Sequence, residues 1–91
     1  MNPPQPSEYP AFCKPYIATV SADVWAEFRQ QEITFSTFIS QIPKEKENYA
    51  YAAEKWTVKE VIGHLLDTER IMAYRALRFA RNDSTELQGF D

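Results

Sequence analysis

Histidine, cysteine and glycine are scarce in this 91-residue sequence, which holds one histidine, one cysteine and two glycines. A single cysteine cannot form an intrachain disulfide, which fits a reducing cytosol, and we expect a cytoplasmic protein. All-β folds use glycine in many of their turns, so this composition favours helices joined by few connections. No apolar run exceeds a few residues, and we expect neither a signal peptide nor a membrane-spanning segment.

Positive charge is also in short supply, because 10 basic residues face 13 acidic ones and the net charge is −3. Affinity for the phosphate backbone comes from clustered positive charge, so we expect no nucleic-acid partner. The hydrophobic share of 44%, with 14% aromatic residues, is typical of a globular chain and not of a disordered one.

The first half of the sequence divides into a leader and a helix. Residues 1–20 are rich in proline and aromatic residues, and we expect them to lie over a surface without forming a helix. A first helix is predicted over residues 21–42, with Ser21 as its N-cap and Pro43 as its stop. Its apolar seam repeats at steps of four and three residues: Val24, Phe28, Gln31, Phe35, Phe38 and Ile42.

The second half begins with a polar connection over residues 43–56 and continues as a second helix over residues 57–81. Thr57 and Glu60 have the spacing of a capping box, and Trp56 with Val61 has that of a hydrophobic staple. Residues 82–91 are predicted to form a loop, with Gly89 as its turn residue.

The apolar arc of the second helix is wider than the seam of a two-helix hairpin requires. It comprises Val58, Val61, Ile62, Leu65, Leu66, Met72, Ala73, Ala76, Leu77, Phe79 and Ala80. We therefore expect an all-α fold in which an antiparallel hairpin is half of a four-helix bundle, completed by dimerisation or by a longer chain. Glu69 falls inside this arc and requires either an ion pair or a metal or catalytic role.

His64 lies on the flank of the same helix, in a stripe with Thr68, Ile71 and Arg75. Glu60 lies one turn before it and Asp67 one turn after it. A stable metal site needs three or four ligands, so periodicity alone favours a surface or interface histidine.

The run from Lys55 to Arg70, KWTVKEVIGHLLDTER, closely resembles the DinB-like family of bacterial metal-binding four-helix bundles, which includes YfiT-type proteins. Tyr74–Ala76, the closing LQGFD of residues 87–91 and the leading Pro6–Pro10 extend this resemblance over nearly the whole chain. The chain thus looks like the first two helices of a family domain.

The resemblance implies a divalent nickel or zinc ion held by three histidines, of which His64 in the G-H-L-x-D motif would be the first. The other two would come from the last helix of an intact family domain. Glu60 or Asp67 would then orient the second ring nitrogen of His64. Intact relatives are described as metal-dependent hydrolases or thiol-dependent transferases, with substrates mostly unknown. This chain, with one histidine, is expected to be inactive alone.

An alternative function is a non-catalytic interaction module. In that case the hairpin forms a homodimer through its open apolar arc, and His64 has a structural role.

Overall fold

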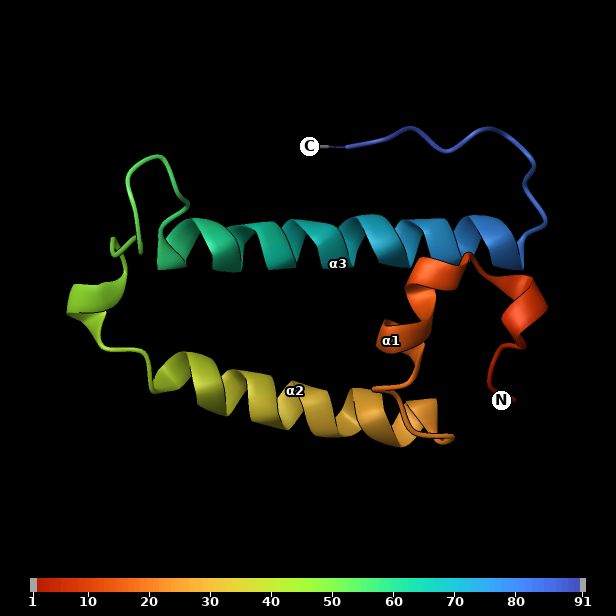
Figure 1. Ribbon diagram of the computed structural model, residues 1–91, viewed down its shortest axis with the longest axis horizontal. Helices are drawn as coiled ribbons and strands as arrows, with labels where there is room; N and C mark the ends of the chain where they lie inside the picture. Colours follow the sequence, from red (N-terminus) through yellow and green to blue (C-terminus); the bar gives the residue numbers. More distant parts are fainter. Residues whose placement is uncertain (1, 91) are drawn as a thin grey trace. The chain divides into compact units, whose positions relative to one another are not determined.

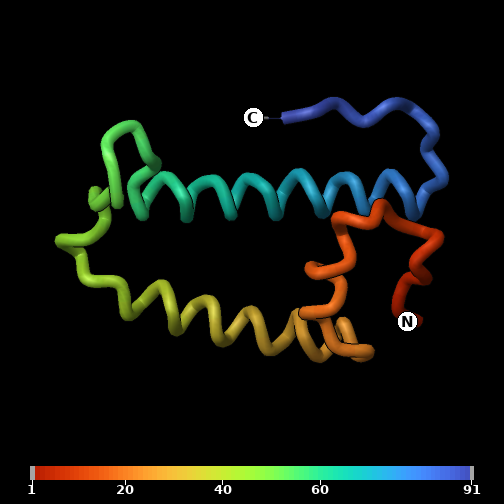
Figure 2. The backbone as a smooth tube through the Cα atoms, in the orientation of Figure 1, coloured from red at the N-terminus to blue at the C-terminus, as the bar shows by residue number. Residues whose placement is uncertain are grey.

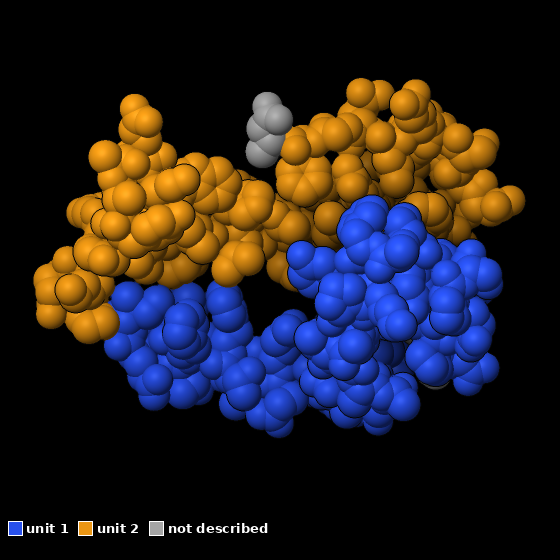
Figure 3. Space-filling model, in the orientation of Figure 1, with its two compact units in different colours: residues 1–42 blue, residues 43–91 orange. Residues whose placement is uncertain are grey.

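The computed structural model describes residues 2–90, and every regular element in this part of the chain is helical. The all-α prediction is confirmed. The α-helices are α1 (Lys14–Ile17), α2 (Val24–Ser40) and α3 (Val58–Ala80), and short 3₁₀ helices are found at Pro6–Glu8, Ala11–Cys13 and Lys44–Lys46 (Figure 1). The chain divides into two compact units, Met1–Ile42 and Pro43–Asp91 (Figure 3), which we describe separately.

The leader of the first unit is more helical than its prolines suggested. The expectation of a helix-free segment over residues 1–20 is wrong, because 3₁₀ turns precede α1 and α1 itself contains Pro15. Pro15 lies in the first turn of α1, where a missing N–H costs no hydrogen bond and the fixed φ of proline suits a helix.

Helix α2 is shorter at both ends than the predicted range of 21–42. Its N-cap is Asp23 and not Ser21, because the Asp23 carboxylate accepts a 3.0 Å hydrogen bond from the N–H of Ala26. At the other end Gln41 is the C-cap. Pro43 disfavours the helical conformation in the residue before it, so the helix stops ahead of Ile42.

Helix α3 begins where the sequence predicted, because its first donors all find acceptors. The Thr57 side chain accepts the N–H of Glu60 at 3.2 Å, and the Glu60 carboxylate accepts the N–H of Thr57 at 2.7 Å. The next two free N–H groups, those of Val58 and Lys59, donate to the carbonyls of Tyr49 and Glu47, each at 3.0 Å. The connection and the capping box together anchor the start of the helix.

Helix α3 ends in a Schellman motif. Asn82 adopts a positive φ of 53°, and the N–H groups of Asn82 and Asp83 donate to the carbonyls of Phe79 and Arg78. The turn residue is therefore Asn82 and not Gly89, which has no positive φ; asparagine tolerates this left-handed conformation better than most residues. After this turn the chain runs back along α3 (Figure 2), and residues 83–90 are called the return segment below.

The apolar arc of α3 remains largely open to solvent. Among residues 2–90 no side chain is buried, and Val61, Leu65 and Met72 are 42–45% exposed. Glu69 is also exposed, so the buried ion pair expected for it is absent from the described residues. None of the described helices is long and apolar enough to span a membrane.

Candidate functional site

His64 lies in the second turn of α3, and its side chain is half-buried. The Trp56 ring packs against the imidazole with 4.9 Å between ring centroids and 63° between ring planes. The sequence had assigned Val61 as the contact of Trp56. The indole is long enough to reach one turn further, since positions 61 and 64 are neighbours on the same helix surface.

The two carboxylates expected to orient His64 have other partners. Oε2 of Glu60 accepts from both the N–H and the hydroxyl of Thr57, at 2.7 and 2.9 Å, as part of the capping box. These two hydrogen bonds, first from the backbone and then from the side chain, lower the pKa of Glu60 below its usual 4.5. Asp67 pairs with Arg70 at 3.2 Å on the exposed surface. The expected orienting role is therefore not seen in these contacts.

The flank stripe identified in the sequence is also present in the structure as a half-buried line along α3. His64, Thr68, Ile71 and Arg75 are all of intermediate exposure, whereas most of their neighbours are exposed. The Thr68 hydroxyl is buried and has no hydrogen-bond partner among the described residues. An unpaired polar atom of this kind, one turn from the imidazole, is unusual in a folded protein and calls for a ligand, water or further protein contact.

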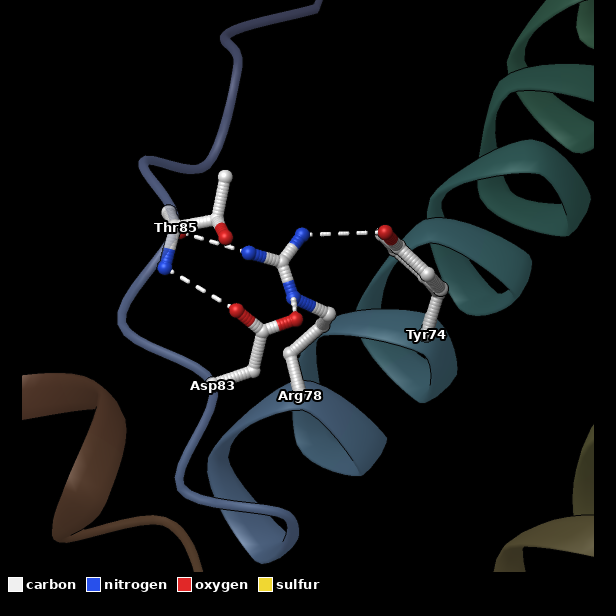
Figure 4. Close-up of polar contacts among 4 residues, drawn as sticks. All are labelled: Tyr74, Arg78, Asp83 and Thr85. Carbon is white, nitrogen blue, oxygen red and sulfur yellow. Dashed lines mark hydrogen bonds and ion pairs between the residues drawn. The ribbon is translucent and has the colours of Figure 1, made fainter.

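Arg78 links the end of α3 to the return segment (Figure 4). Its Nε lies 2.6 Å from Oδ2 of Asp83, and its two terminal nitrogens donate to the Tyr74 hydroxyl at 2.9 Å and the Thr85 carbonyl at 2.6 Å. The Arg78 side chain is only 13% exposed. Hydrogen bonds from Thr85, and next the Arg78 guanidinium, lower the pKa of Asp83 below its usual 3.8.

Arg75, one turn earlier on the same face, holds the far end of the return segment. It donates to the Gln88 carbonyl at 2.7 Å, and its guanidinium lies 5.2 Å from the centre of the Phe90 ring. Both arginines bind backbone carbonyls, so these contacts set the path of the chain and depend little on the side chains of Thr85 and Gln88. The return segment therefore meets the stripe that carries His64 at its C-terminal member, Arg75.

The donors needed for a complete metal site are not assembled by these residues. Within residues 2–90 no three His, Cys, Asp or Glu side chains are grouped closely enough to hold one ion. His64 is the one residue of the predicted ligand set that the chain contains. The local features that fit a ligand are its half-buried imidazole and, one helical turn away, the unpaired Thr68 hydroxyl.

An all-helical chain with this motif on its long helix also matches a known family. The model of the DinB superfamily matches residues 27–91, well over half of the chain, and the protein belongs to that superfamily. Comparison with curated proteins and with solved structures gives no match.

Two functional features were missed by sequence reasoning. Trp56 was recognised as a staple residue but not as the neighbour of His64. Arg75 was placed only in the flank stripe and Arg78 was given no role, whereas both contact the return segment. Their spacing of three residues on one helix face was the sequence feature that could have indicated a shared role.

Proposed function

We propose that this chain is a DinB-type metal-binding domain in which His64 is one ligand of a divalent nickel or zinc ion. The observation that carries the proposal is the environment of the His64 imidazole. It is half-buried on α3, packed against Trp56, and one helical turn from Thr68, whose buried hydroxyl has no partner among the described residues. Neutral imidazole is a preferred ligand of both metals.

One imidazole cannot hold such an ion alone, so the proposal takes the remaining ligands from elsewhere. They come either from a second copy of the chain or from another segment of a longer protein. In the complete domain the metal would supply Lewis-acid chemistry for a hydrolase or a thiol-dependent transferase. The described residues of this chain contribute the first ligand and its surroundings.

Metal analysis tests this function. We expect nickel or zinc to bind to the purified protein, and to an otherwise identical sample extended by any native sequence beyond position 91, with loss of binding in His64→Ala. Asp67→Asn, which changes a neighbouring exposed carboxylate on the same helix, should bind as the unmodified protein does. Absence of bound metal from both samples, or equal binding by His64→Ala, contradicts the proposal.

A second candidate function is a non-catalytic interaction module that dimerises into a four-helix bundle. It is favoured by the openness of the apolar arc, where Leu65, Leu66 and Leu77 are 42–51% exposed. Contiguous apolar surface of this kind is typical of interaction sites. A sedimentation experiment at micromolar concentration distinguishes the two: a monomer with a cooperative melt counts against the module, and a dimer that binds no metal counts against the metal site.

A further inference from the structure

From the contact between the two rings we infer that Trp56 is a positioning residue for His64, holding the imidazole in one orientation for metal binding. This inference rests on the proposed function. It assigns to an aromatic side chain the role that the sequence had given to Glu60 or Asp67.

Trp56 is itself firmly placed, because the residues on either side of it are anchored to the start of α3. Thr57 directly follows it and makes both hydrogen bonds of the capping box. On the upstream side, the Tyr49 carbonyl accepts the N–H of Val58 at 3.0 Å, which ties the connection to the same helical turn. The backbone from which the indole extends toward His64 is therefore held in place.

The contact with Trp56 restricts the orientation of the imidazole. A histidine on a helix surface can rotate about χ1 and χ2, and each extra orientation lowers the population that can bind a metal. An edge-to-face aromatic pair with 4.9 Å between centroids is favourable and stabilises the orientation that makes it. The hydrogen bonds of Glu60 and Asp67 among residues 2–90 are with Thr57 and Arg70 and not with the His64 ring.

The alternative orienting groups are less suited to the task. Oε2 of Glu60 accepts two hydrogen bonds from Thr57, and moving the carboxylate away from them would weaken the start of the helix. Asp67 is 70% exposed and paired with Arg70, so solvent screens it. Among the contacts found for these residues, Trp56 makes the one that touches the imidazole.

The experiment uses the form of the protein, 91 residues or extended, that binds metal in the test above, in a Trp25→Phe background that leaves Trp56 as the sole tryptophan of residues 1–91, and Ni²⁺ alone as the probe. Binding is measured by calorimetry for Trp56→Leu, Trp56→Phe and His64→Ala, and the imidazole C–H resonances are recorded by NMR without metal. Tyr51→Leu is the matched control, because Tyr51 lies in the same connection and is 74% exposed.

We expect Trp56→Leu to weaken Ni²⁺ binding by about 2- to 10-fold, as for loss of one aromatic pair, and to remove the ring-current shift of the His64 resonances. Trp56→Phe should recover part of both effects, and Tyr51→Leu should change neither. Helix content by circular dichroism shows whether each variant folds. If Trp56→Leu does not fold, the positioning role is tested by the smaller losses of Ni²⁺ affinity and ring-current shift expected for Trp56→Phe.

Unchanged affinity in a folded Trp56→Leu, or unchanged affinity and resonances in Trp56→Phe, overturns the positioning role while leaving the metal site intact. A His64→Ala variant that binds Ni²⁺ as tightly as the background protein overturns the proposed function itself, and the positioning role with it.

Discussion

Thr57 shows how a single residue can determine where a helix begins. Its side chain accepts one N–H, its own N–H is accepted by Glu60, and the flanking donors are satisfied by the connection. The contacts between Thr57 and Glu60 join residues only three positions apart, which is why the sequence predicted them correctly. Trp56, the next residue back, shows the opposite. Its contact with His64, eight residues away, depends on how far the indole extends, and the sequence did not indicate it; the staple contact with Val61 stays a prediction.

Thr57→Ala should destabilise the protein by about 1 kcal/mol, because one N-terminal donor of α3 loses its acceptor. Thr57→Ser keeps the hydroxyl and should lose much less. The measurement is thermal unfolding followed by circular dichroism at 222 nm. Equal melting of the alanine and serine variants would show that the capping box contributes nothing to stability.

At the scale of elements, α3 and the return segment behave as one piece of structure. The Schellman motif at Asn82 reverses the chain, and two arginines three residues apart then hold backbone carbonyls of the returning segment. The sequence predicted the end of the helix and a loop after it. It did not indicate the path of that loop, because the contact from Arg75 to Gln88 joins residues thirteen positions apart.

Arg78→Gln should loosen the return segment while leaving α3 helical. Loss of the guanidinium removes the ion pair of Asp83 and the donor to the Thr85 carbonyl together, so backbone amides of residues 85–90 should exchange hydrogen faster. Arg70→Gln is the control, because it removes the same charge from an ion pair whose side chains are 78% and 70% exposed. Exchange rates that respond equally to both changes would contradict the role of Arg78.

Acid should weaken both ends of α3. The pKa values of Glu60 and Asp83 are lowered in the folded chain, so each carboxylate stabilises the fold in full above its usual pKa, 4.5 and 3.8 respectively. This stabilisation is lost as pH falls through the lower folded pKa. We expect the melting temperature to decline between roughly pH 5 and pH 2.

The matched variant for this prediction is the double change Glu60→Gln and Asp83→Asn, which keeps hydrogen-bonding oxygens but does not titrate. Its melting temperature should vary less over the same acid range. A decline as steep as that of the unmodified protein would assign the acid sensitivity to other carboxylates.

At the scale of the whole molecule, the main feature is the apolar arc of α3, where Leu65, Leu66 and Leu77 are 42–51% exposed. The exposed leucines of α3 lie on one arc, as the 3.6-residue period predicted. Membership of the DinB superfamily, shown over residues 27–91, is consistent with an arc that packs in a helical bundle. What covers the arc in solution determines whether the protein acts as a monomer or as an assembly.

Leu65→Glu places a charge in the middle of this arc and should shift any dimer toward monomer, because burial of an unpaired carboxylate is costly. Ala53→Glu adds the same charge in the exposed connection and should leave association unchanged. Sedimentation equilibrium over a range of concentrations measures both. An equal association constant for the two variants would place the contact surface away from the arc.

The sequence alone determined the helical class, the start of α3 at Thr57, its end near Arg81, the stripe that carries His64 and the family resemblance. These properties depend on residues three or four apart or on a contiguous motif, where helix geometry is known in advance. The tertiary structure decided that Trp56 packs on His64, that Glu60 is committed to its cap, and that Arg75 and Arg78 hold the return segment. Such contacts depend on the reach of long side chains and on the path of a turn, which hydrophobic periodicity does not specify.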